Sequence, residues 1–155
     1  MPLSLKLRRV AMRCAWLGLR AYWFVVRPNV VGVKCVLLND DHVLLVRHTY
    51  GRRGWDLPGG TAKRREVPID AARREMHEEL GRRIEDWEYL GVLFANSDHH
   101  RDNIHLFQTH IGDRRLDIDL MELAEADWFH PDRLPRDVSP FVARILARAA
   151  MPSES

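Results

Sequence analysis

The chain has 155 residues and a mass of 18.1 kDa, which suits a single domain of ordinary size. Hydrophobic residues make up 46% of it and charged residues 30%, a balance that excludes a disordered or collagen-like chain. The two cysteines, Cys14 and Cys35, are too few and too widely spaced for a disulfide framework. We therefore expect reduced thiols and a cytoplasmic protein.

Charge is distributed unevenly along the chain. Residues 1–27 contain six basic residues and no acidic one, so this segment carries +6. Because the whole chain carries +2, the remainder carries −4. A body of that charge lacks the basic face that general nucleic-acid binding needs, and we expect no stable complex with nucleic acid. A bound metal ion would still allow it to bind a phosphate ester.

The basic segment predicts a helix over residues 3–26 that ends before Pro28. Apolar side chains recur at alternating steps of four and three, as in a coiled-coil seam, at Leu3, Leu7, Val10, Cys14, Leu17, Ala21 and Phe24. Arg13 and Arg20 interrupt the apolar runs that a membrane-spanning helix or a signal peptide would need. Two roles stay open: packing on the chain's own domain or on a second copy, and peripheral contact with the inner membrane surface.

Strands are predicted from residue 30 onward. Residues 30–38 and 42–49 are rich in Val and Leu and flank the turn at 39–41, which predicts a hairpin. Residues 55–57 predict a short strand that is closed by a turn at Pro58-Gly59-Gly60.

Helices and further strands follow in alternation. Residues 68–80 predict a helix, with Pro68 in its first turn and Gly81 as its C-terminal cap. Further strands are expected near 87–95, near 103–112 and at 128–129. Ser139-Pro140 is expected to cap a final helix. This order predicts an α/β fold in which helices cover a mixed sheet.

Three carboxylates are grouped on the helix predicted over 68–80. Glu75, Glu78 and Glu79 stand at i, i+3 and i+4, so their side chains project from one face. Their mutual repulsion costs helix stability unless a cation neutralises it. Oxygen ligands suit Mg²⁺, with Mn²⁺ as a substitute, and Mg²⁺ commonly shares its ligands with substrate phosphates. A solvated acidic helix face is the alternative interpretation.

The surrounding residues resemble the signature of the Nudix hydrolases. That signature has a glycine, five residues, a glutamate, seven residues, Arg-Glu, an apolar residue, any residue, Glu-Glu, any residue, a glycine and an apolar residue. The matching positions are Gly60, Glu66, Arg74, Glu75, Met76, Glu78, Glu79 and Gly81. Arg82 departs from the pattern, because an apolar residue is expected there. Residues 55–60, Trp-Asp-Leu-Pro-Gly-Gly, also resemble the usual approach to this signature.

The resemblance implies a Nudix-type α/β/α sandwich with a mixed β-sheet over residues 28–155, preceded by the extra basic amphipathic helix of residues 1–27. It also implies hydrolysis of the pyrophosphate linkage of a nucleotide derivative, such as a (d)NTP, ADP-ribose or another nucleotide sugar. Such enzymes need a divalent cation, usually Mg²⁺, and water activated by the metal attacks phosphorus. A non-catalytic module that senses a nucleotide on the same fold is the alternative.

The resemblance also implies roles for individual residues. Glu75, Glu78, Glu79 and the Gly60 carbonyl are the expected metal ligands, and Gly59 permits the tight turn beside them. We expect Glu66 and Arg74 to brace the loop against the helix through a charge-assisted hydrogen bond.

The general base is open among several carboxylates. Glu78 or Glu79 fits while also binding metal, and Glu122 or Glu125 fits as an acid outside the signature, although both also fit plain surface positions.

Four residues near the expected cleft are candidates for substrate binding. Arg47, His48 and Arg52 are candidates to hold an outer phosphate, with solvated surface positions as the alternative. Trp55 is a candidate to stack on a base or, alternatively, to pack beneath the glycine turn.

Overall fold

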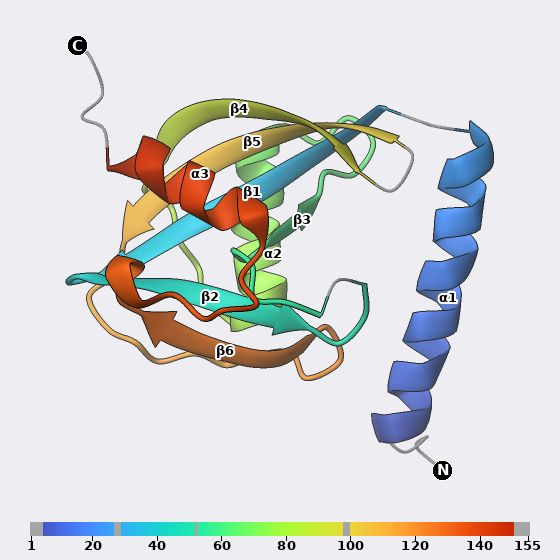
Figure 1. Ribbon diagram of the computed structural model, residues 1–155, viewed down its shortest axis with the longest axis horizontal. Coiled ribbons are helices and arrows are strands. Elements are labelled where there is room, and N and C mark those ends of the chain that lie inside the picture. Colours follow the sequence, from blue (N-terminus) through green and yellow to red (C-terminus); the bar gives the residue numbers. More distant parts are fainter. Residues whose placement is uncertain (1–4, 27–28, 52, 98–99, 151–155) are drawn as a thin grey trace.

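The computed structural model describes residues 5–26, 29–51, 53–97 and 100–150. Its helices are α1 (Leu5–Val26), α2 (Pro68–Leu80) and α3 (Pro140–Ala149), with a short 3₁₀ helix at Pro131–Arg133. A twisted sheet forms the middle layer, with α3 in front of it and α2 behind it (Figure 1). Helix α1 stands to one side of these layers (Figure 1).

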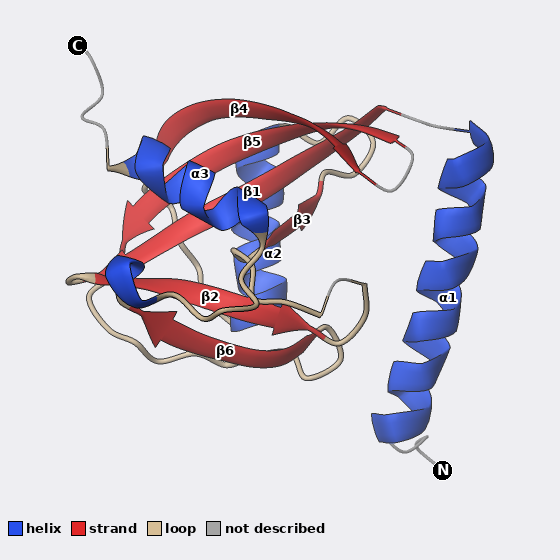
Figure 2. Cartoon of the chain, viewed as in Figure 1, coloured by secondary structure: helices blue, strands red, loops and turns tan. Residues whose placement is uncertain are grey.

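The sheet is six-stranded and mixed (Figure 2). Its strands are β1 (Asn29–Asn39), β2 (His42–His48), β3 (Gly59–Thr61), β4 (Glu88–Ser97), β5 (His100–His110) and β6 (Leu123–Phe129). They follow the order β4-β5-β1-β2-β6, and β3 pairs with β1. Only β1 and β5 run parallel among these pairs. The predicted hairpin is confirmed at the turn, where Leu38 pairs with Val43.

Alternating side chains of β1 supply the core on both faces of the sheet. Cys35 and Leu37 pack in the cluster that contains Met76 of α2, whereas Val36 packs in the cluster that contains Ile145 of α3. Successive side chains of a strand point to opposite faces, so one strand serves both layers. The α/β/α sandwich expected from the sequence is therefore confirmed.

The glycine turn differs from its prediction. The expected strand at 55–57 forms only isolated bridges, Val46 to Asp56 and Trp55 to Val138, and the expected turn residues form β3 instead. Gly59 has φ +148°, and a Cβ there would lie 2.1 Å from the Val33 carbonyl oxygen. The missing side chain lets this segment pair closely with β1, which the sequence pattern alone did not distinguish from a turn.

The predicted helix ends are only partly correct. Helix α2 has the predicted bounds, and Gly81 caps it with φ +65° while its N–H donates to the His77 carbonyl. Ser139 stands at the N-cap of α3, but its side chain makes no cap hydrogen bond. The prediction of a serine cap is therefore wrong in its chemistry, although α3 begins where expected. Strand β6 is longer than expected, because its first residues pair with β2.

Two basic residues of helix α1 form hydrogen bonds to the sandwich. Arg9 donates to the Leu120 carbonyl at 3.0 and 2.8 Å, and Arg13 donates to the Thr49 carbonyl at 3.1 Å. The seam residues Leu7, Val10, Cys14, Leu17 and Ala21 are exposed. Residues 3 and 4 of the predicted helix lie outside the described residues.

No helix within the described ranges has the length and hydropathy to cross a bilayer. A dimer contact or a membrane-surface contact through the apolar seam stays a prediction, as does the cytoplasmic location.

Candidate metal and active site

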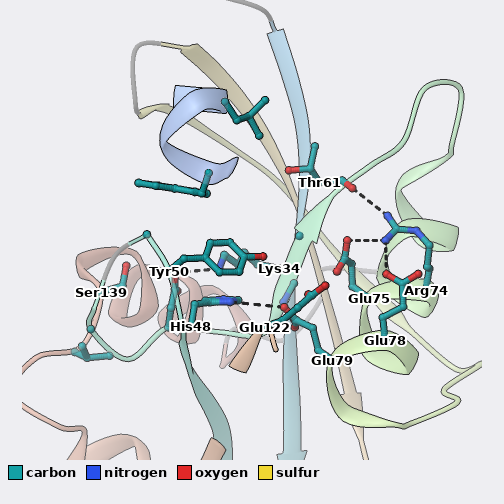
Figure 3. A pocket seen from close by; sticks show the side chains of 18 of the residues that line it. Lys34, His48, Tyr50, Thr61, Arg74, Glu75, Glu78, Glu79, Glu122 and Ser139 are labelled. Carbon is teal, nitrogen blue, oxygen red and sulfur yellow. Dashed lines mark hydrogen bonds and ion pairs between the residues drawn. The ribbon is translucent and has the colours of Figure 1, made fainter. Parts of the chain in front are cut away.

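A cavity of about 680 Å³ opens between α2, the turn before β3 and the segments that follow β2. Carboxylates line one side of it, and Lys34, His48 and Tyr50 line the other (Figure 3). Helix α2 presents Glu75 and Glu79 to the cavity because Met76 and Leu80, on the adjoining side of the helix, are held in the core. The metal ligands predicted from the sequence therefore border this cavity.

Three glutamates form a compact cluster in this cavity. Glu75, Glu79 and Glu122 each offer a carboxylate oxygen, and these atoms lie within 4.8 Å of one another. Glu75 and Glu79 are buried, with 8% and 1% of their surface exposed. Hard divalent cations such as Mg²⁺ bind an oxygen-only donor set of this kind. The residues present therefore fit the ion that the sequence analysis expects.

The electrostatics of Glu79 also fit a cation. Burial and the neighbouring carboxylate of Glu75 raise the pKa of Glu79 to about 8. Burial likewise raises the pKa of Glu75 and that of Glu122. A buried carboxylate is costly to ionise without positive charge beside it, so a divalent cation would stabilise the ionised cluster.

Arg74 joins the glycine loop to α2. Its Nε and one terminal nitrogen each donate to a different oxygen of Glu66 at 2.9 Å, a bidentate pair. Its second terminal nitrogen donates to Glu75 at 2.7 Å, and the side chain also reaches the Thr61 carbonyl. Arg74 lowers the pKa of Glu66 to about 2 and has its own pKa raised by the pair. The contact expected between Glu66 and Arg74 is present.

Glu78 lies outside the cluster. Its carboxylate receives a hydrogen bond of 3.0 Å from Arg74 and lies 4.0 Å from the Lys63 ammonium. Its side chain is 44% exposed, against 2% for that of Glu79. The structure therefore brings together Glu75 and Glu79, as expected, and adds Glu122 in place of Glu78.

The loop before β6 positions Glu122. The Glu122 carbonyl accepts from the Thr49 N–H at 2.9 Å, and the Thr49 hydroxyl donates to the Met121 carbonyl at 2.7 Å. By contrast, Glu125 pairs with Arg47 at 3.1 Å and does not line this cavity. Of the two acids that the sequence singles out beyond the signature, only Glu122 reaches the cluster.

The residues proposed for substrate binding divide into two groups. His48 lines the cavity with its Nδ1 3.9 Å from Glu79 Oε1, and burial together with Lys34 lowers the pKa of His48 to about 4. Arg47 does not line the acidic cavity, because it pairs with Glu125 and with Asp137. Arg52 lies outside the described residues.

Of the two roles considered for Trp55, the structure favours packing in the core. Trp55 is only 7% exposed and packs edge-on against Phe129, with ring centroids 4.9 Å apart. Its other neighbour is the guanidinium of Arg47, 4.8 Å from the ring centroid. Trp55 therefore belongs to the core on the α3 side of the sheet, in keeping with the packing alternative.

The cavity-lining residues that sequence reasoning missed include Lys34, Tyr50 and Trp16. Lys34 donates to Asp56 and to the Leu57 carbonyl, both at 2.9 Å. The sequence did contain a sign of its role, because Lys34 is a charged residue within the apolar stretch 30–38. Trp16 had none, because its place depends on how α1 docks against the sandwich.

Comparisons with known proteins agree with this arrangement. The model of the NUDIX domain family matches residues 28–149. The NAD-capped RNA hydrolase NudC of Edwardsiella ictaluri is 32% identical over 79% of this chain and 46% of its own length. The ADP-ribose pyrophosphatase of Mycobacterium tuberculosis is 38% identical over 38% of this chain and 31% of its own. The chain thus spans less than half the length of these curated relatives.

Solved structures show the same fold. The MutT NUDIX hydrolase of Burkholderia pseudomallei superposes with a TM-score of 0.71 at 22% identity, covering 78% of this chain and 98% of that one. Together, the family match, the sandwich and the acidic cavity on α2 identify the chain as a member of the NUDIX family.

Proposed function

We propose that the chain is a divalent-metal-dependent hydrolase that cleaves the diphosphate linkage of a small nucleotide derivative. The observation that carries the proposal is the cluster of Glu75, Glu79 and Glu122 in an open cavity, with the first two of these carboxylates buried. Curated relatives named for hydrolysis of ADP-ribose and of NAD-capped RNA support the substrate class. Mg²⁺ is the ion we propose, with Mn²⁺ as a substitute.

In this proposal, the carboxylates of Glu75 and Glu79 hold the cation, with the Gly60 carbonyl as a further ligand and Glu78 as a ligand reached by rotation away from Arg74. A bound Mg²⁺ supplies neutralisation of the diphosphate charge and activation of water. Gly59 holds the Glu79 carboxylate through its N–H, and Arg74 holds that of Glu75. These hydrogen bonds orient the ligands before the substrate arrives.

We assign proton transfer to Glu122. Its carboxylate lies at the edge of the cluster and is half-buried, and burial with neighbouring acids raises its pKa toward the working range of a general base. Its carboxylate oxygen would accept the proton of the attacking water while the water oxygen forms a bond to one phosphorus. The bond between that phosphorus and the bridging oxygen would break, and the other phosphate group would leave with the bridging oxygen. His48, with its lowered pKa, stays neutral at pH 7 and adds no competing positive charge.

The test is hydrolysis of a nucleotide panel with Mg²⁺ by the wild type, by Glu79→Gln and by Glu85→Gln. The panel holds the common (d)NTPs, ADP-ribose, UDP-sugars, NAD and a short NAD-capped RNA. Glu85 is the matched control, because its side chain is 78% exposed and lies away from the cavity. We expect Glu79→Gln to lose at least about two orders of magnitude in kcat/KM and Glu85→Gln to retain it.

Two outcomes would contradict the proposal. Equal hydrolysis by Glu79→Gln and the wild type would show that the cluster is not the catalytic site. Tight nucleotide binding without hydrolysis of any panel member would favour the alternative, a nucleotide-sensing module on the same fold.

A further inference from the structure

A second cavity, of about 550 Å³, lies between α1 and the segment that follows β2. It adjoins the acidic cavity, since Trp16, His48, Tyr50 and Gly51 line both. The family match begins at residue 28, so α1 is an addition of this chain to the family fold. The second cavity is thus partly built by a helix that the family does not supply.

The two cavities have opposite charge. The second one is lined by arginines, namely Arg9, Arg13, Arg47 and Arg53. Arg47 is neutralised by Glu125 and Asp137. Arg9, Arg13 and Arg53 pair with no carboxylate of the part of the chain that the structure describes. Three cationic groups therefore face a hollow that opens beside a site for a diphosphate.

Backbone contacts hold two of these arginines without neutralising them. Arg9 and Arg13 donate to the carbonyls of Leu120 and Thr49, which fixes α1 against the loops on both sides of the acidic cluster. A guanidinium has five donors, so each arginine keeps further N–H groups for a ligand. Planar arginine forks suit the oxygens of a phosphate group.

Aromatic rings lie where the cavities meet. The Arg20 guanidinium lies over the Trp16 ring, 4.8 Å from its centroid. The same ring lies close to Gly51, because a Cβ added at Gly51 would come within 3.3 Å of Trp16 Cζ2. Gly51 has φ +79°, a conformation that glycine adopts without strain. Burial and nearby carboxylates raise the pKa of Tyr50 to about 12, so its hydroxyl stays a neutral hydrogen-bond donor. These rings offer a platform for a ribose or a base.

We propose that α1, together with Thr49, Tyr50, Gly51 and Arg53, forms a subsite for a phosphate group that the substrate carries in addition to the diphosphate that is cleaved. Arg13 and Arg53 bind this phosphate, and Trp16 contacts the nucleoside between the two phosphate sites. This inference rests on the proposed hydrolase function. It predicts discrimination between nucleotides that share a diphosphate but differ by one further phosphate.

The experiment compares two substrate pairs, each differing by one phosphate. One pair is ADP-ribose and its 2′-phosphate, and the other is NAD and NAD with a phosphate on the 3′ oxygen of its adenosine ribose, the atom through which an RNA chain continues. In the wild type we expect kcat/KM to be about tenfold higher for the phosphate-bearing member of at least one pair. Preference within the first pair places the phosphate on the 2′ oxygen, and preference within the second places it on the 3′ oxygen, as in an RNA chain.

Three variants test the assignment. Arg13→Gln and Arg53→Gln should each remove most of the preference for the phosphate-bearing member of the pair. Arg53→Gln tests phosphate binding separately from the docking of α1, because the hydrogen bonds described between α1 and the sandwich come from Arg9 and Arg13. Arg8→Gln is the control, because it removes the same charge from α1 at an exposed residue that does not line the cavity.

The outcomes separate the subsite from the hydrolase function. Hydrolysis of both members of each pair at the same kcat/KM, in the wild type and in all variants, would overturn the subsite and leave the hydrolase function standing. If no member is hydrolysed, the hydrolase function fails, and calorimetric binding of both pairs to the same proteins tests the subsite alone. Tighter binding of the phosphate-bearing member, lost in Arg53→Gln but kept in Arg8→Gln, would support it, and equal binding would overturn it.

Discussion

The Gly59 N–H donates a hydrogen bond of 3.1 Å to Glu79 Oε2, across 20 residues of sequence. This bond joins the first residue of β3 to the most buried acid of α2. It satisfies one oxygen of a carboxylate that has little access to water. The metal cluster is therefore positioned by the sheet as well as by the helix that carries it.

The two adjacent glycines should respond differently to substitution. A Cβ at Gly59 would lie 2.1 Å from the backbone oxygen of Val33, whereas a Cβ at Gly60 would lie 2.3 Å from Oε1 of Glu75, the end of a side chain. We expect Gly59→Ala to lower the free energy of unfolding by about 2 kcal/mol or more. Gly60→Ala should cost less stability but displace Glu75 and weaken Mg²⁺ binding. Urea unfolding and metal titration of both variants check this, and equal loss of stability would contradict it.

Arg74→Ala should lower the free energy of unfolding far more than Arg73→Ala does. Arg74 forms ion pairs with Glu66, Glu75 and Glu78, and its side chain is only 18% exposed. Arg74→Ala therefore leaves partly buried carboxylates without their positively charged partner. We expect a loss of about 3 kcal/mol in the free energy of unfolding. Arg73→Ala, the control, removes exposed ion pairs and should cost less than about 1 kcal/mol. Chemical denaturation measures both, and a similar loss in the two would refute the bracing role.

Glu122 and Glu125 provide a matched test of the proton acceptor. The two acids are three positions apart in sequence, but only Glu122 lies in the cluster. Glu122→Gln should lower kcat by about two orders of magnitude, because a carboxamide cannot accept the proton. Glu125→Gln should keep kcat within about threefold, since it loses only a surface pair with Arg47. The measurement is kcat of both variants on the panel substrate that the wild type hydrolyses fastest. A larger loss of kcat in Glu125→Gln than in Glu122→Gln would exclude the assignment.

Much of this arrangement was predictable from sequence. The bounds of α2 and the cap at Gly81 follow from local spacing, because each depends on residues within one helix and its adjoining loop. The approach of Glu66 to Arg74 was expected from the family resemblance. The succession of strands along the chain, apart from β3, also followed from local patterns of Val, Leu and turn residues.

The rest depended on contacts between distant segments. Glu122 joins Glu75 only because the loop before β6 is bonded to Thr49, and no spacing rule connects those positions. The sequence left two roles open for Trp55, because its burial against Phe129 is decided by the packing of the core on the α3 side of the sheet. Residue 59 was assigned to a turn because it stands in a Pro-Gly-Gly run. Its pairing with β1 depends on a contact between distant segments, which that run does not reveal.

Stability should depend on pH through Glu79 when no metal is bound. The folded-state pKa is about 8 and the ordinary value is 4.5, so the folded protein binds a proton that the unfolded chain releases. The resulting stabilisation is fully present below about pH 4.5 and is lost as pH rises through 8, at about 1.4 kcal/mol per pKa unit.

Urea unfolding in EDTA at pH 5, 7 and 9 measures this dependence. The free energy of unfolding should fall more steeply with pH in the wild type than in Glu79→Gln, which cannot titrate at that position. The same slope in both proteins would contradict the assignment to Glu79.

The most direct test of the metal site is titration with Mn²⁺, followed by electron paramagnetic resonance of the free ion. Wild type, Glu79→Gln and the exposed control Glu85→Gln are compared without nucleotide. The cluster of Glu75, Glu79 and Glu122 predicts Mn²⁺ binding that weakens at least about tenfold in Glu79→Gln and is unchanged in Glu85→Gln. Equal affinity in all three proteins would contradict the site.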